Sequence, residues 1–448
     1  MSIEVSVKPE VSYLATLLEQ CRQGAVVKID WLEELRNSAT AIVQELAIPS
    51  KRQEEWRFTD LSSLLQVQFQ AVDSQSVPSL QQLDISSLTL PETAASCLVF
   101  INGVYAPQLS AVTGLPAGVF VGNLAELPSQ YTSRLEDYLG KQQGASEVFT
   151  ALNTAGLTDI AVVWVAKNTI VEQPIHLLFV STTEEVPVIC QPRTLVVAEA
   201  GSQLHLIEDY GANIEGYPDI PINKPYFTNQ VTEIWVEENA AVTHTRNQRE
   251  AADGFHIGKT AIAQARYSRY TGNAINLGAK LSRHNLEVWQ TGEGTQTTLN
   301  GLTMISGEQL ADTHSAVALN HPHSTSNQLH KCIVDGRGHA VFNGKVFVPQ
   351  EAQFTNASQL NRNLLLSPKA RVDTKPQLEI TADQVKCSHG ATVSQLEADE
   401  IFYLQSRGIN EVDARNLLID AFVAEILAQI PVTSLRKRLA SCTACRTY

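Results

Sequence analysis

The chain has 448 residues, which favours two or three domains, or one elongated repeat body with appendages, over a single ordinary core. Its 33 Lys and Arg residues are outnumbered by 47 Asp and Glu residues, giving a formal net charge of −14. This acidic balance excludes the basic stripe of a nucleic-acid-binding protein. The first residues lack a basic segment followed by an apolar one, and no later run approaches about 18 apolar residues. We therefore expect a cytoplasmic protein with neither a nucleic-acid nor a membrane partner.

The cysteines indicate a reducing environment. There are seven of them, an odd number spread over a long chain, unlike the dense disulfide framework of a small secreted domain. Cys442 and Cys445 form a CxxC pair, but no second pair accompanies it and it lies at the end of the sequence. We expect this end to be a frayed tail.

The first 60 or so residues have a helical pattern. Apolar residues occur at the i, i+3, i+4, i+7 spacing of one helix face at Leu14, Leu17, Leu18 and Cys21. A second helix is predicted to begin at Asp30, which we expect to be its cap, and to end before Pro49. The charged segment 51–64, around Trp56, is predicted to be a solvated turn that enters a short helix.

From about residue 156 the pattern changes to the period of two that is typical of strands. Apolar and β-branched runs cover 159–171, 174–180, 193–210 and 232–247. Tight turns are predicted within these runs at Lys167-Asn168, Gly201-Ser202 and Glu238-Asn239. No helical pattern follows until the C-terminal segment, so the middle of the chain is predicted to be mainly β.

Many short strands without helices are compatible with a sandwich, a barrel or a β-solenoid. A sandwich favours Asn-Gly hairpins, and such pairs occur at Asn102, Asn300 and Asn343, but most of the turns are short corners. We therefore predict a parallel β-helix core flanked by N-terminal and C-terminal helical domains that cover its open ends. The predicted domains are a helix-rich region 1–155, the core 156–393 and a helical domain 394–448.

The C-terminal segment returns to a helical pattern. Ser394 and Glu397 form a predicted capping box, and Gly408 is placed to end the helix that it opens. Asn410 is predicted to cap a longer helix that closes at Pro431. These helices carry more apolar surface than a lone pair buries, so they pack on the β body or bind a partner.

Two groups of residues are candidates for metal chemistry. The first consists of His314, His321, His323, His330, Cys332 and His339, which form a metal site or cap polar turns. The second is Cys387 and His389 in KCSHGATV, which share one face if this segment is a strand. The pair is then half of a metal or persulfide site, or a buried thiol beside a hydrogen-bonded histidine.

No segment has a usable nucleotide-binding loop or another common catalytic motif. Any ATP on which the protein depends must therefore be handled by another subunit. Two enzymatic alternatives remain open. One is a carbohydrate-active β-helix enzyme with paired carboxylates in a groove, and the other is a metal-dependent enzyme that uses the His314 to His339 cluster.

Several long segments resemble the SufB/SufD family of iron-sulfur cluster assembly scaffolds. They are DTKPQLEITADQVKCSHGATV (373–393), FYLQSRGIN (402–410), HPHSTSNQLHK (321–331) and VFNGKVFV (341–348). The resemblance covers roughly the last 250 residues and extends more loosely back to EEWRFTD (54–60). The B branch has a glutamate-containing block at 388–392 and a cysteine within 361–366, and this chain has neither. It is more similar to the D branch.

The resemblance implies a right-handed parallel β-helix and a non-catalytic scaffold subunit of the SUF (SufBCD) complex. It implies pairing with a SufB-like subunit along the β-helix ends, and docking of a SufC-like ABC-type ATPase on the C-terminal helices. The isolated chain is then a candidate for homodimerisation through the same edge.

The resemblance also implies the site residues. A transient iron-sulfur cluster would form at the partner interface, where the family histidine matches His389 and the neighbouring cysteine matches Cys387. Glu400, Tyr403 and Arg407 are the predicted ATPase-docking residues. No permanently bound cofactor is expected. Reduced flavin is implied as an electron source for the complex, although no segment of this chain marks a flavin site.

Overall fold

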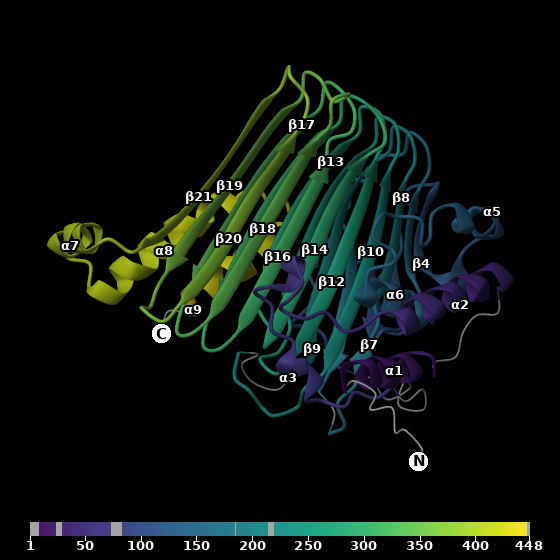
Figure 1. The fold of residues 1–448 in the computed structure, drawn as a ribbon, viewed down its shortest axis with the longest axis horizontal. Coiled ribbons are helices and arrows are strands. Elements are labelled where there is room, and N and C mark those ends of the chain that lie inside the picture. The colour runs from purple at the N-terminus through teal and green to yellow at the C-terminus, as the bar shows by residue number, and fades with distance from the viewer. Residues whose placement is uncertain (1–8, 24–28, 73–82, 184, 214–218, 446–448) are drawn as a thin grey trace, which may run out of the picture.

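A computed structural model describes residues 9–23, 29–72, 83–183, 185–213 and 219–445. The middle of the chain forms a parallel β-solenoid, with helices packed near both of its ends (Figure 1). This confirms the predicted mainly β fold with helical flanks. The domain boundaries stay a prediction, since strands precede residue 156 and the first of them joins the solenoid.

The helices lie at the two ends of the sequence. The α-helices are α1 (Pro9–Cys21), α2 (Asp30–Glu45), α3 (Ser62–Leu65), α5 (Ser129–Thr132), α6 (Val148–Ala155), α7 (Ala398–Ser406), α8 (Glu411–Leu427) and α9 (Thr433–Cys445). The short 3-10 helices are η1 (Glu54–Trp56), η2 (Pro91–Thr93), η3 (Leu124–Glu126) and η4 (Leu135–Asp137).

The strands form two sheets. The first sheet contains β1 (Ser96–Ile101), β2 (Val104–Tyr105), β3 (Ala111–Val112), β6 (Ile175–Thr182), β9 (Gln203–Asn213), β11 (Ala241–Arg249), β13 (Arg269–Asn276), β15 (Gln296–Ile305), β17 (Thr325–Val334), β19 (Asn356–Leu365) and β21 (Lys386–Gln395). The second sheet contains β4 (Val119–Asn123), β5 (Ala161–Val165), β7 (Ile189–Cys190), β8 (Arg193–Ala198), β10 (Phe227–Val236), β12 (Phe255–Gln264), β14 (Leu281–Gln290), β16 (Leu310–Ala318), β18 (His339–Val348) and β20 (Arg371–Ile380).

From β8 on, successive strands alternate between the two sheets, so each rung of the solenoid adds one strand to each sheet. Within a sheet, neighbouring rungs pair in parallel, as β10 does with β12 and β9 with β11. The corners are tight because Asn168, Gly201 and Asn239 adopt positive φ angles. The turns predicted at these three positions are therefore confirmed.

The interior is a continuous apolar core. It extends from Leu98 and Val163 in the first rungs to Leu378 and Cys387 in the last. The side chain of Gln359 approaches the backbone of Gly344 closely, which explains the glycine in VFNGKVFV. A Cβ at position 344 would overlap the side-chain amide of Gln359. Strand alternation thus produces both a buried face and an outward polar face.

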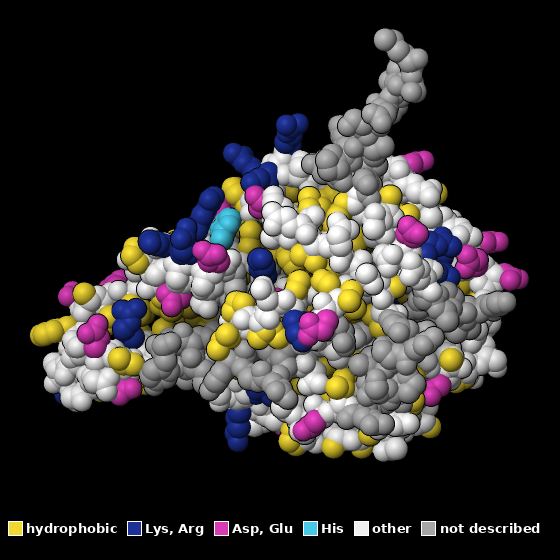
Figure 2. All heavy atoms as spheres, turned by 90° about the horizontal axis from the view of Figure 1, so that it is seen from below, with side chains coloured by type: hydrophobic (Ala, Val, Ile, Leu, Met, Phe, Trp, Pro, Cys, Tyr) yellow, Lys and Arg dark blue, Asp and Glu magenta, His cyan; other side chains and the backbone are white. Residues whose placement is uncertain are grey.

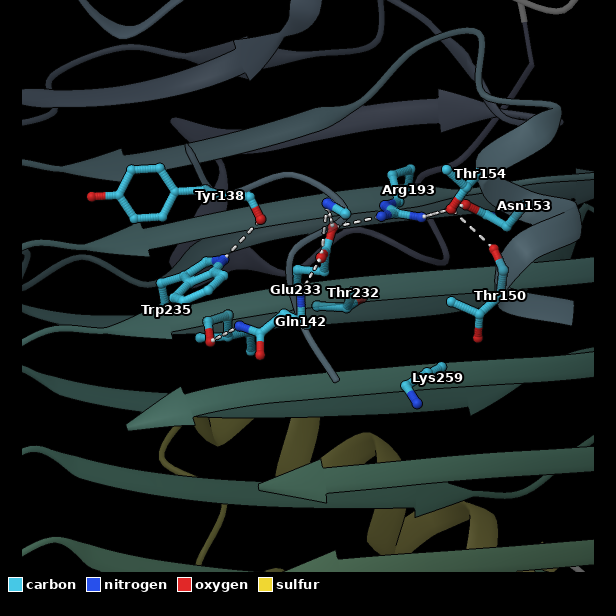
Figure 3. A network of polar contacts seen from close by, with 12 residues as sticks. Tyr138, Gln142, Thr150, Asn153, Thr154, Arg193, Thr232, Glu233, Trp235 and Lys259 are labelled. Atoms are coloured by element: carbon cyan, nitrogen blue, oxygen red, sulfur yellow. Dashed lines mark hydrogen bonds and ion pairs between the residues drawn. The ribbon is translucent and has the colours of Figure 1, made fainter. Parts of the chain in front are cut away.

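A buried ion pair attaches the N-terminal region to the outer face of the second sheet (Figure 3). Arg193 of β8 pairs with Glu233 of β10, and both side chains are almost fully buried. The backbone N–H of Gly140 donates to both Glu233 oxygens at 3.0 Å, while Arg193 donates to Oδ1 of Asn153 at 3.0 Å. The network joins α6 and the segment before it to the solenoid.

The segment around Trp56 is an exposed turn, as predicted, except that Trp56 itself is buried. Trp56 is 6% exposed and lies in η1, with the Arg283 guanidinium 3.9 Å from its ring centroid. Arg283 also forms an ion pair with Asp312. Burial is the largest single influence and raises the pKa of Asp312, but the Arg283 charge, His314 and the Thr59 hydrogen bond together lower it to about 2. The short helix that follows, α3, agrees with the prediction.

Two predicted caps are wrong. Asp30 is the first helical residue of α2 and Ile29 is its N-cap, without a side-chain hydrogen bond. Ser394 caps no helix, because β21 continues through it and its hydroxyl donates to the Asn363 carbonyl at 3.3 Å. Asn410 does cap α8, since its Oδ1 accepts from the Asp413 N–H at 2.9 Å.

The predicted frayed tail is helical as far as Cys445, in α9, and its last residues, 446–448, lie outside the described residues. Helices α8 and α9 pack on the outer face of the first sheet through residues such as Ile426 and Leu435. Cys442 is buried and contacts Arg249. One apolar face of α8 and α9 is therefore covered by the β body, whereas α7 has no buried residue. No helix among the described residues is long and apolar enough to span a membrane.

Candidate functional site

The last rung of the solenoid, β20 and β21, is its exposed end. In the described residues β20 pairs only with β18 and β21 only with β19, so each has one free edge. Nearly every residue of β21 is exposed, whereas β17, two rungs earlier, is largely buried. A free strand edge of this length is a ready template for pairing with another chain.

The two free edges differ in their hydrogen-bond donors. The Lys386 N–H donates inward to the Thr355 carbonyl at 3.0 Å, so the odd-numbered N–H groups of β21 point outward. In β20 the Arg371 N–H donates inward to Gly338 at 3.0 Å, which places Pro376 at an outward position. Proline has no N–H, so it interrupts the β20 edge and leaves β21 as the edge with uninterrupted donors.

Cys387 and His389 lie on one face of β21, as the sequence predicts. Cys387 is half-buried and packs against the solenoid core, and this burial raises the pKa of its thiol. His389 is exposed and stands in register with Gln359 of β19. Gln359 is buried, and its Oε1 has no hydrogen-bond partner in the described structure. The pair therefore marks the point where the inner face of the solenoid opens to solvent.

Thiolate and imidazole are both suitable ligands for iron. Two ligands do not complete a site, and no cluster of three or more His, Cys, Asp or Glu side chains suited to a metal occurs in the described residues. The thiolate is the form that binds metal, so a metal ion at Cys387 would have to displace the thiol proton. Cys387 and His389 alone therefore do not make a complete metal site.

The histidines between 314 and 339 are dispersed by the fold. His314 lies on the outer face of the second sheet and contacts Glu55, while His330 is buried and stacks on Phe342. His339 pairs with Asp373 at 2.7 Å. The described structure therefore does not bring these residues together into one metal site. This arrangement does not support the alternative of a metal-dependent enzyme that uses them.

The predicted ATPase-docking residues do lie together. Helix α7 has no buried residue, and Tyr403 is 58% exposed. Arg407 stacks over the Tyr403 ring at 5.4 Å from its centroid. Glu400 lies three residues before Tyr403, on the same helix face. Next to Tyr403, Phe402 is 70% exposed, and the sequence analysis missed this apolar contribution.

Charges of both signs are exposed at the end of the solenoid near α7. Arg337, Lys369 and Arg371 are exposed at the corners that connect the last rungs. Most Lys and Arg side chains visible in Figure 2 lie on the half of that face nearest α7, interspersed with Asp and Glu side chains. Helices α7 and α8 themselves contain more Asp and Glu than Lys and Arg.

Fold and site together define a β-solenoid protein with a half-buried cysteine and an exposed histidine at an open end. The chain belongs to the SufB/SufD family: the model described as "SUF system FeS cluster assembly, SufBD core domain" matches residues 179–422. The model described as "SufBD protein N-terminal region" matches residues 9–177. The chain is therefore an iron-sulfur cluster assembly protein of the SUF system, which confirms the predicted family.

Three relatives illustrate the range of the family. An iron-sulfur cluster assembly SufBD family protein of Synechocystis is 54% identical, over 92% of this chain and 90% of the relative. Protein ABCI7, chloroplastic, of Arabidopsis thaliana is 36% identical, over 97% and 92%. The iron-sulfur cluster assembly protein SufD of Escherichia coli is 32% identical, over 88% of each chain. These matches lend no support to the carbohydrate-active alternative.

Proposed function

We propose that the chain is the D-type scaffold subunit of a SufBCD complex and has no catalytic activity of its own. It pairs with a SufB-like subunit through the last rung of the solenoid and docks a SufC-like ATPase on α7. The observation that carries the proposal is the free β21 edge, which presents Cys387 and His389 beside uninterrupted outward N–H groups.

The pairing proposal follows from the physics of the last rung. Exposed backbone donors and acceptors favour addition of another strand, and Val393 is 51% exposed on the same strand. A strand from the partner would bring its ligands next to His389 and Cys387. The nascent iron-sulfur cluster is then a transient cargo of the interface rather than a resident cofactor. In the absence of a partner, a second copy of this chain is the natural occupant of the same edge.

The docking proposal rests on helix α7 and its connection to the solenoid. Helix α7 exposes Phe402 and Tyr403, while the adjoining α8 is anchored to the first sheet by the ion pair between Lys331 and Glu425 at 2.7 Å. A force applied to α7 thus reaches β17 through α8. The interface between the two scaffold subunits has an open and a closed arrangement. ATP binding shifts the balance between them only if the ATP-bound ATPase has different affinities for the two arrangements.

Replacing Tyr403 with alanine is expected to reduce recovery of the ATPase with this chain by about tenfold or more. Aromatic anchors of this kind typically contribute about 2 kcal/mol or more to an interface. The measurement is co-purification of the SufC-like subunit with the tagged chain. Tyr267→Ala is the matched control, because Tyr267 is also exposed, at 43%, but lies at a solenoid corner. Equal recovery with both variants would place the docking surface elsewhere.

We also propose that the protein acts in a reducing compartment, the bacterial cytoplasm, where Cys387 stays a free thiol. The Arabidopsis relative is described as chloroplastic, so a plastid is the corresponding location for that protein. Reduced flavin remains a proposed electron source of the complex, to be supplied by another subunit or from solution.

A further inference from the structure

One corner of the solenoid repeats the same backbone conformation in seven successive rungs. It joins the end of each strand of the second sheet to the start of the next strand of the first sheet (Figure 1). At each of these corners one residue has a positive φ angle, between 56° and 72°, and its N–H donates to a carbonyl of the next rung. We call these residues the corner column: Asn168, Gly201, Asn239, Tyr267, Gly294, His323 and Phe354.

The residues of the corner column differ in how well they suit this conformation. Glycine and asparagine tolerate a positive φ and occupy four of the positions, whereas a bulky side chain is strained there. Tyr267 has a packing reason, because its ring lies against Gly294 of the next rung and the Arg266 guanidinium stacks over it. Phe354 has no such cover, since its one ring contact in the described structure is the stack with His323.

The aromatic stack of His323 and Phe354 is exposed. Its rings are nearly parallel, with an angle of 5° between them and centroids 5.1 Å apart. Phe354 is 58% exposed, and His323 is exposed as well. At the other end of the same corner, Phe347 is 37% exposed. An apolar ring that a strained backbone keeps in water indicates a role in binding rather than in folding.

Phe354 lies one rung before the edge that is proposed to pair. Its N–H donates to the Gln384 carbonyl of the last corner at 2.8 Å. Strand β21, which carries Cys387, begins at Lys386, two residues after Gln384. Neighbouring rungs of a parallel sheet are about 4.8 Å apart. A chain that adds a strand to β21 therefore lies next to the corner that displays Phe354.

The corners around this stack carry negative charge. The segments 349–355 and 381–385 contain two carboxylates, Glu351 and Asp383, and no Lys or Arg, although Lys386 follows as the first residue of β21. Both carboxylates are exposed, and neither forms an ion pair in the described part of the chain. A partner segment with Lys or Arg is complementary to these charges, and such a cation can also lie over an exposed aromatic ring.

We propose that Phe354, supported by His323, is an aromatic anchor for the subunit that pairs with β21, and that it contacts a segment of that subunit with Lys or Arg beside apolar residues. The inference rests on the proposed function, since it extends the β21 interface around the corner. It has a consequence of its own, because the side chain that the partner binds is one that strains the isolated chain. Folding and pairing are therefore expected to respond in opposite directions when Phe354 is replaced.

The test is the dissociation constant of the purified chain and the SufB-like subunit, with Phe354→Asn as the variant. Asparagine occupies two earlier positions of the corner column, so it relieves the strain and removes the ring. The melting temperature of the isolated variant is expected to be equal to that of wild type or higher, while the dissociation constant rises about tenfold or more. Tyr267→Asn is the matched control, three rungs and about 14 Å earlier, and is expected to pair like wild type.

Charge complementarity is tested with the double variant Glu351→Gln, Asp383→Asn. Its dissociation constant is expected to be about threefold or more above that of wild type at low salt. The difference is expected to vanish at high salt, because exposed charges are screened. An unchanged dissociation constant at low salt would contradict a basic partner segment.

Ala391→Pro, which removes an outward N–H of β21, separates this inference from the proposed function. If Ala391→Pro prevents pairing and Phe354→Asn pairs like wild type, the aromatic anchor is wrong and the scaffold proposal stands. If neither variant weakens pairing, the last rung is not the interface and both proposals are wrong. If Phe354→Asn instead abolishes self-association of the isolated chain and leaves pairing unchanged, a second copy is the occupant, which also overturns the inference.

Discussion

Replacing Ala391 with proline is expected to abolish pairing of the chain with a SufB-like subunit while the solenoid stays folded. The Ala391 N–H points outward from β21, because Lys386 donates inward and the direction alternates along the strand. Proline therefore removes a donor that a partner strand needs and leaves the β19 ladder intact. The loss of this bond and the clash of the ring with a partner strand are expected to weaken pairing by about a hundredfold or more.

The measurement is the dissociation constant of the two purified subunits, with Ala391→Val as the control. Valine keeps the N–H and suits a strand, so this variant is expected to pair like the unmodified chain. A melting temperature equal to that of wild type shows that Ala391→Pro still folds. Normal pairing of a folded Ala391→Pro variant would exclude the β21 edge as the interface.

Replacing Glu233 with alanine is expected to release the N-terminal region from the solenoid. The variant leaves the buried Arg193 guanidinium without its counter-charge, and the Gly140 N–H without an acceptor. Breaking a buried pair on one side typically costs about 3–5 kcal/mol. The effect is expected to be local, because the network of Figure 3 joins α6 and its preceding loop to β8 and β10.

Hydrogen exchange of residues 138–155 measures this release directly, and thermal unfolding records its effect on the whole chain. Glu238→Ala is the matched control, since its ion pair with Arg266 is about half exposed and is expected to contribute less than about 1 kcal/mol. Replacing both Arg193 and Glu233 with methionine is expected to restore part of the stability. Unchanged exchange in Glu233→Ala would show that apolar packing alone docks this region.

The solenoid was predictable because its signals are local. Period-two runs predict strands, and short corners such as those at Gly201 and Asn239 favour a solenoid over a sandwich or a barrel; the structure has both features. Strand alternation likewise places Cys387 and His389 on one face. Their role in cluster assembly stays a prediction, because the ligands that would complete the site are not part of this chain.

The errors arose where distant residues decide local structure. Trp56 is buried because the Arg283 guanidinium covers its ring. Arg283 also donates a hydrogen bond to the carbonyl of Glu55, which lies 228 positions earlier in the sequence. Ser394 and Glu397 have the spacing of a capping box, but the pairing of β21 with β19 extends the strand through Gln395.

The measurement that tests the scaffold account most directly is anaerobic co-expression with the SufB-like subunit and the ATPase. Iron and acid-labile sulfide per complex are compared for the unmodified chain, His389→Ala and Cys387→Ala. The account predicts that the complex with His389→Ala assembles but that its iron and sulfide fall to background. Full loading of both variants in an intact complex would contradict it and would reduce KCSHGATV to a packing motif.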